Sequence, residues 1–99
     1  MMAVRLLPEA EEELLAAAKF YEAEQAGLGR ALLQEFRRKL RLIQEHPLAA
    51  RVERAEVRAR TVGRFPYRRY YRARRDEILV VAVGHRHRRP GYWRSRVVT

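Results

Sequence analysis

The segment Ile78-Leu79-Val80-Val81-Ala82-Val83 decides the fold of this chain, because it is the longest uninterrupted apolar run in the sequence. It is far shorter than the roughly 20 residues that a membrane span requires. A short apolar run rich in β-branched residues is typical of a strand that is buried on both faces. We therefore expect residues 78–83 to form the central strand of a sheet.

Two more strands are expected just before the central one. In residues 57–62, Val57, Ala59 and Thr61 alternate with Arg58, Arg60 and Val62, which is the period of a strand with one buried and one exposed face. Residues 63–66 interrupt this pattern, and residues 67–73 form the next strand. The polar residues 74–77 then make the hairpin turn into the central strand. The second half of the chain thus predicts an antiparallel meander.

The first half of the chain predicts a strand and two helices. Residues 4–7 are apolar and end at Pro8, which suits the first turn of a helix because its missing N–H is not needed there. Apolar residues then recur at helical spacing up to Gly27 and again from Leu32 to His46-Pro47. The order β-α-α-β-β-β predicts one α+β domain over residues 1–99, with a helical hairpin packed on one face of an antiparallel sheet.

Charge is strongly segregated along the chain. Residues 1–56 carry nine Lys or Arg and ten Asp or Glu, whereas residues 57–99 carry thirteen Arg and only two acidic residues. Such a basic half favours a polyanionic partner, with nucleic acid as the leading candidate. The absence of cysteine excludes disulfides, thiolate metal sites and cysteine nucleophiles. We find no secretory signal and no membrane span, so we expect a cytoplasmic protein.

Four arginines are candidates for binding phosphate. Arg58 and Arg60 project from the same side of their strand, Arg68 is expected to project near them, and Arg86 follows the central strand. Guanidinium groups bind phosphate through parallel hydrogen bonds and keep their charge. The alternative is a solvated strand face on which arginines only keep the sheet soluble.

The tail contributes His85, His87, Tyr92 and Trp93. The two histidines have no evident third ligand and lie among arginines, so we expect no metal and no cofactor. A histidine or tyrosine beside a phosphate cluster can instead transfer protons. Tyr92 is expected to be exposed, and it and Trp93 can stack on bases, although a lone tryptophan beside a small core more often packs. The acidic residues 11–13 are interpreted as helix-dipole and solubility charges.

The whole chain resembles the RelE/ParE superfamily of type II toxin–antitoxin toxins. The resemblance rests on the helix start at residues 8–10, on Phe65-Pro66-Tyr67-Arg68, and on the buried strand at residues 78–83. It also rests on residues 85–96, which are similar to the ending His-x-x-Arg-x-Pro-x-Tyr-Trp-x-x-Arg of many members.

The resemblance implies two alternative activities. In the RelE-like branch the toxin cuts mRNA on the ribosome without a metal, because the 2′-hydroxyl attacks the neighbouring phosphate. The positions that match this branch are Arg58, Arg60, Arg68, Arg86 and Tyr92. Since arginine is a poor proton carrier, His85 or His87 is the candidate for the proton transfers. This set favours an mRNA endonuclease with the ribosome and mRNA as partners.

The ParE-like branch instead inhibits DNA gyrase by binding it, without nuclease chemistry. A non-toxic or degenerate RNA-binding module is a third reading of the same residues. In either toxin branch the resemblance implies a cognate antitoxin as partner. The exposed apolar residues Leu15 and Phe20 are the candidate docking surface for it.

Overall fold

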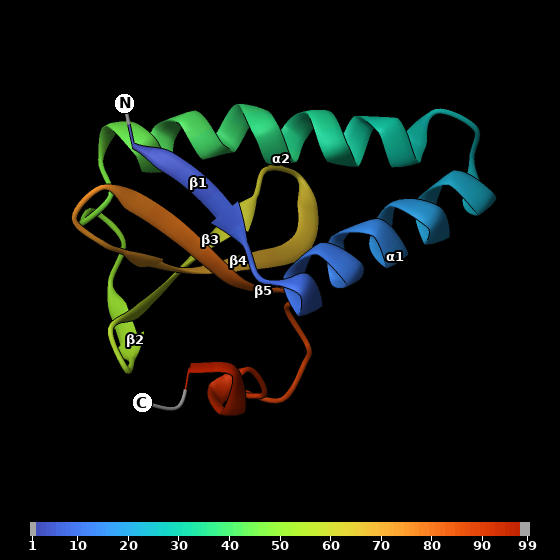
Figure 1. Cartoon of the computed structure of the whole chain (residues 1–99). Helices are drawn as coiled ribbons and strands as arrows, with labels where there is room; N and C mark the ends of the chain where they lie inside the picture. Colours follow the sequence, from blue (N-terminus) through green and yellow to red (C-terminus); the bar gives the residue numbers. More distant parts are fainter. Residues whose placement is uncertain (1, 98–99) are drawn as a thin grey trace.

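The computed structural model describes residues 2–97, which form one five-stranded sheet with two helices on one of its faces (Figure 1). The strands follow the spatial order β1-β5-β4-β3-β2. In chain order the elements are β1 (Ala3–Leu6), α1 (Pro8–Glu24), α2 (Leu28–Glu45), β2 (Val52–Arg54), β3 (Val57–Val62), β4 (Phe65–Ala73), β5 (Glu77–His85) and the 3-10 turn η1 (Arg94–Val97).

Strand β5 is the centre of the sheet, as its apolar sequence predicts. It pairs with β1 on one side and with β4 on the other, and every residue from Ile78 to Val83 is at most 6% exposed. The α+β class and the order of the predicted elements are confirmed. Two details differ: β1 runs parallel to β5, so the sheet is mixed, and a short extra strand, β2, extends the far edge.

The helical hairpin is closed by a tight contact between its two helices. A Cβ atom at Gly29 would lie only 2.3 Å from the carbonyl oxygen of Ala18, so only glycine permits this approach. The carboxylate of Glu22 accepts hydrogen bonds from the backbone N–H groups of Gly27 (2.7 Å) and Gly29 (2.9 Å). Helix α1 thereby supplies the acceptor that satisfies free N–H groups at the start of α2.

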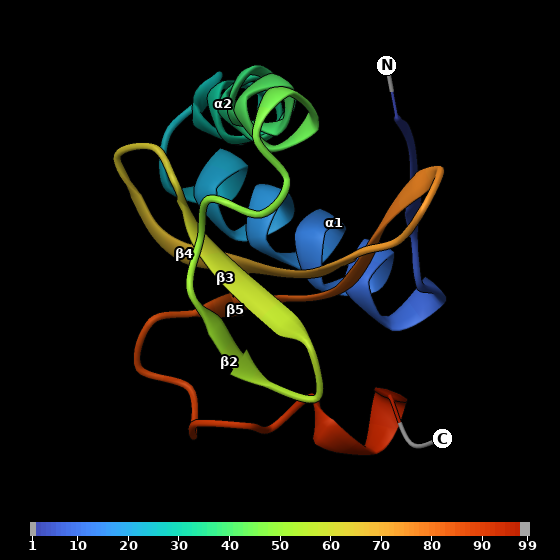
Figure 2. The same ribbon diagram turned by 90° about the vertical axis from the view of Figure 1, so that its left-hand side faces the viewer.

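The sheet separates two apolar cores. On the helix side, buried residues of α1 and α2 pack against Val62, Tyr71 and Val80. On the other side, which we call the outer face, Trp93 and Val97 pack against a second set of buried residues: Val57, Tyr70, Leu79, Val81 and Ala82. Figure 2 shows the C-terminal segment lying across the sheet from the helices. The expectation of one exposed sheet face is therefore wrong, because the chain folds back to bury it.

Candidate functional site

The predicted phosphate-binding arginines lie on two different sides of the sheet. In the pairing of β3 with β4, Arg60 lies opposite Arg69, whereas Thr61 lies opposite Arg68. Paired residues project to the same side, so Arg60 points to the helix side and Arg68 to the outer face. Arg58 pairs with the helix-side residue Tyr71. The prediction that Arg58 and Arg60 project near Arg68 is wrong, because strand register was not readable from the alternation alone.

Arg58 connects strand β3 to the segment that follows α2 through hydrogen bonds. Its guanidinium donates hydrogen bonds to the carbonyl oxygens of Leu48 (3.1 Å) and Ala50. These contacts hold the connection between α2 and β2 against β3. The side chain therefore makes structural contacts in addition to carrying charge.

Arg68 and Tyr92 are neighbours on the outer face. Arg68 pairs with Gly84 of β5, and Tyr92 lies directly over that glycine, because an added Cβ at Gly84 would be 2.4 Å from the Tyr92 hydroxyl oxygen. The guanidinium of Arg68 lies 3.6 Å from the carboxylate of Glu53 in a half-exposed pair. Arg86 is exposed, and its backbone N–H donates to the carbonyl oxygen of Pro66 (2.9 Å).

Tyr92 is held by charged side chains instead of projecting freely. The Arg88 guanidinium lies 3.9 Å and that of Arg96 lies 5.2 Å from the centre of the Tyr92 ring. The hydroxyl oxygen is buried and lies close to the Glu13 carboxylate, although it forms no hydrogen bond of good geometry among residues 2–97. Burial, together with the nearby Glu13 carboxylate, raises the pKa of Tyr92 well above its ordinary value. The expectation of an exposed Tyr92 is therefore wrong, and its hydroxyl stays protonated at neutral pH.

Trp93 is part of the core of the outer face. Its side chain is 1% exposed, and its ring centre lies 5.7 Å from that of Tyr70. The packing interpretation is confirmed, and stacking of Trp93 on an RNA base is incompatible with this burial.

His85 and His87 contact each other at the end of β5. The backbone N–H of His87 donates to Nδ1 of His85 (3.1 Å), and the two ring centres are 5.0 Å apart. His85 pairs with Tyr67 across the strands, so it projects to the helix side, away from Arg68. In residues 2–97 no group of three His, Asp or Glu side chains is placed to hold a metal ion.

One structural pair was missed by the sequence reasoning. The carboxylate of Glu13 accepts two hydrogen bonds from Arg96, at 2.7 and 3.0 Å, and both side chains are mostly buried. The interpretation of Glu13 as a solvated charge is wrong. A signal was present, because Glu13 follows Ala10 by three residues and precedes Ala17 by four, which places it beside the buried face of α1.

The Glu13–Arg96 pair also completes the backbone hydrogen bonding of β5. Strand β1 pairs with β5 only up to Val80, after which the chain turns into α1. Beyond that point the N–H of Val83 donates to Glu13 (3.0 Å), and the carbonyl oxygen of Val81 accepts from Arg96 (3.1 Å). The pair thus joins α1, β5 and the C-terminal segment at the edge where β1 ends.

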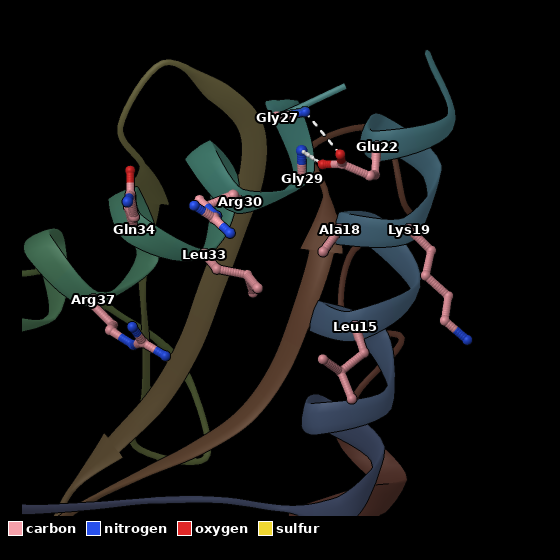
Figure 3. Close-up of a pocket in the computed structure, with 10 residues that line it drawn as sticks. All are labelled: Leu15, Ala18, Lys19, Glu22, Gly27, Gly29, Arg30, Leu33, Gln34 and Arg37. Atoms are coloured by element: carbon pink, nitrogen blue, oxygen red, sulfur yellow. Dashed lines mark hydrogen bonds between the residues drawn. The ribbon is translucent and has the colours of Figure 1, made fainter. Parts of the chain in front are cut away.

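A groove runs between the two helices, with a volume of about 920 Å³ (Figure 3). Leu15 and Leu33 give it apolar walls, and three basic residues also line it: Lys19, Arg30 and Arg37. Of the described lining residues the one carboxylate is Glu22, which already accepts two backbone N–H groups. Leu15 is 48% and Phe20 is 57% exposed, as expected. Neither helix in the described part of the chain is long and apolar enough to cross a membrane.

Comparison with known proteins identifies the family. A family model described as "ParE toxin of type II toxin-antitoxin system, parDE" matches residues 4–90. The chain belongs to the ParE toxin family. A solved structure from the "Chromosomal ParDE TA system from P. aeruginosa" has the same fold, with a TM-score of 0.74 at 20% identity over 86% of this chain and 96% of that one. No curated protein sequence matches this chain significantly.

Proposed function

We propose that this chain is the toxin of a type II toxin–antitoxin pair and that it acts by binding DNA gyrase, without cutting RNA. Membership of the ParE toxin family supports the first part of the proposal. The second part rests on one observation: of the side chains that nuclease chemistry would use, Arg68, Arg86 and Tyr92 lie at one end of the sheet, whereas Arg58, Arg60 and His85 project to its helix side.

Cleavage of RNA through its 2′-hydroxyl needs cationic side chains that bind the phosphate. It also needs groups that transfer protons within hydrogen-bond reach of the same phosphate. Here Arg58 and Arg60 lie on the helix side of the sheet, whereas Arg68 lies on the outer face. The hydroxyl of Tyr92 is buried, and Trp93 is packed in the core. The arrangement of these side chains therefore supports electrostatic binding of a partner better than it supports cleavage of RNA.

The exposed basic residues after β5 suit such binding. Arg86, Arg88 and Arg89 are exposed, and together with half-exposed Arg68 they form a positively charged surface at one end of the sheet. Positive charge of this density speeds association with an acidic surface and fixes its orientation. Gyrase in complex with DNA offers a strongly anionic target.

The test is a supercoiling assay with purified gyrase and relaxed plasmid. We expect the wild-type toxin to inhibit supercoiling, and inhibition to weaken as salt rises. A triple replacement of Arg86, Arg88 and Arg89 by glutamine should reduce inhibition at least tenfold. Arg74→Gln and Arg75→Gln, which remove charge from the exposed β4–β5 turn, are the controls. The proposal is contradicted if gyrase supercoils the plasmid fully in the presence of the toxin and the same toxin cuts mRNA in a translation reaction.

A ribosome-dependent mRNA endonuclease is the second candidate. One observation favours it: Arg68 and Tyr92 both flank Gly84 on the outer face, close to where Arg86 leaves β5. Primer extension on mRNA from a translation reaction separates the two candidates, because strand breaks are absent if the toxin only binds gyrase.

We also propose that the cognate antitoxin lays an acidic amphipathic segment in the helix groove. The apolar walls and basic rim of the groove fit leucine-type and carboxylate side chains on one segment. Leu15→Glu should weaken antitoxin binding at least tenfold in a titration of the purified pair. Leu48→Glu is the matched control, since Leu48 is 66% exposed and does not line the groove. Equal loss in both variants contradicts this docking site.

A further inference from the structure

A second cavity, of about 310 Å³, lies on the helix side of the sheet between the end of α2 and strands β3 and β4. Four of its lining residues are basic, and none of the described lining residues is acidic. The full lining is Lys39, Leu42, Ala50, Arg51, Ala59, Arg60, Thr61 and Arg69. Cations of this number in one cavity repel one another unless an anion lies between them.

Arg69 is the innermost of these cations. Its side chain is fully buried, and its guanidinium stacks on the ring of Phe36, 3.9 Å from the ring centre. One of its amino groups donates to the carbonyl oxygen of Phe36. Its other nitrogen atoms, Nε and Nη1, are buried and have no hydrogen-bond partner among the described residues.

Arg60 lies beside Arg69 and is also incompletely paired. The two residues are opposite each other in the pairing of β3 with β4, so their side chains project together. The Nε atom of Arg60 is buried and has no partner in residues 2–97. The acidic residue that precedes Lys39 by one helical turn, Glu35, is already hydrogen bonded to Arg38 (2.7 Å).

Buried guanidinium nitrogens normally have an acceptor, because the loss of hydration is costly. Burial lowers the pKa of Arg69 only to about 10, so the group remains charged at neutral pH. The protein therefore carries a buried positive charge without an internal carboxylate. A ligand with oxygen atoms in the cavity would supply the missing acceptors.

We propose that this cavity binds a phosphate group, with Arg60 and Arg69 as its principal donors and Lys39 and Arg51 at its rim. Paired guanidinium groups present parallel N–H donors, which match the oxygen atoms and the double charge of phosphate. The phosphate can be free or can belong to a nucleic acid. The site is separate from the outer face, so it does not depend on the proposed action on gyrase.

The test is isothermal titration calorimetry of the purified chain with inorganic phosphate, at an ionic strength held constant with chloride. We expect saturable binding that Arg60→Gln and Arg69→Met each weaken at least tenfold. Arg74→Gln removes the same charge from an exposed turn and should leave the affinity unchanged. Circular dichroism confirms that each variant is folded, and Arg60→Gln, whose side chain is only partly buried, carries the test if Arg69→Met does not fold.

Competition experiments identify the source and the class of the anion. If a short single-stranded oligonucleotide displaces phosphate, the site binds nucleic acid. If the oligonucleotide does not displace phosphate, the site binds a free anion. Both results support a phosphate site. Acetate that binds as tightly as phosphate overturns the proposed class. Absence of saturable binding, or equal weakening by Arg74→Gln, overturns the site itself.

Discussion

Two arginines on opposite sides of the sheet, Arg69 fully buried and Arg96 mostly buried, are stabilised in different ways. Arg96, at the edge of the outer face, is held by both carboxylate oxygens of Glu13 and by a carbonyl oxygen of β5. Arg69, on the helix side, has one carbonyl oxygen and the face of Phe36. The first arginine is satisfied within the fold and acts as a structural clamp. The second retains buried donors that have no partner among the described residues.

The same contrast separates the two faces of the sheet. On the outer face the C-terminal segment covers the strands, buries Trp93 and pairs Arg96 with Glu13. On the helix side, α2 and the segment after it leave a basic cavity above β3 and β4. Arginines that are close together in the sequence are therefore divided between the two faces of the sheet.

The largest expected effect is the loss of Trp93, which tests whether the outer face is a true core. Trp93→Ala should lower the free energy of unfolding by about 3–4 kcal/mol, because it removes a fully buried aromatic side chain. Urea unfolding followed by circular dichroism measures this change, and Trp93→Phe should cost less. A change below about 1 kcal/mol would show that the C-terminal segment does not pack in solution.

Removing the clamp should have the next largest effect. Arg96→Met should lower the free energy of unfolding by about 2 kcal/mol, because it leaves the Glu13 carboxylate partly buried without its partner. Arg5→Gln, in the exposed pair with Glu77, is the control and should lower stability much less, because solvent screens an exposed ion pair. Equal costs for the two variants would mean that the clamp is no stronger than a surface pair.

Acid should weaken the clamp in a defined direction. Burial raises the pKa of Glu13, but hydrogen bonds from Arg96 and from the Val83 amide outweigh burial, so the net pKa lies below its ordinary value of 4.5. The clamp therefore stabilises the fold above about pH 4.5 and is lost as the pH falls through the lowered pKa. In urea titrations at a series of pH values, Glu13→Gln should reduce the loss of unfolding free energy between pH 5 and pH 3. An unchanged profile would assign the acid sensitivity to other glutamates.

Arg69→Met should change stability least of the buried-residue variants. Methionine keeps the apolar contact with Phe36 and removes a buried charge without a carboxylate, so stability should change by less than about 1 kcal/mol. Urea unfolding without phosphate makes the measurement. A loss as large as that of Arg96→Met would show that Arg69 is a structural residue of the same kind.

Features that depend on local sequence were predictable, and features that depend on pairing between strands were not. The apolar run at residues 78–83 and the helix start at Pro8 indicated the central strand and the hairpin correctly. Strand β2 was missed because its turn uses Ala55 and Glu56, both with positive φ, where asparagine and glycine are the usual signal.

The candidate site was predicted less well than the fold. Whether Arg68 shares a face with Arg58 and Arg60 depends on the register between β3 and β4. A shift of one residue moves a side chain to the other face of the sheet. The burial of Arg69 was not predictable, because nothing in the sequence of a basic strand indicates which of its arginines is buried. Glu13 was the exception, since its spacing from Ala10 and Ala17 already placed it beside the core.

Tyr92→Phe tests whether this toxin acts without hydroxyl chemistry at Tyr92. The substitution keeps the ring between Arg88 and Arg96 and removes only the buried hydroxyl, which lies near the Glu13 carboxylate. The measurement is growth arrest on induction without antitoxin, with primer extension on total mRNA from the same cells. We predict that Tyr92→Phe arrests growth as the wild type does, with mRNA intact in both. A harmless Tyr92→Phe beside a wild type that cuts mRNA would contradict the account.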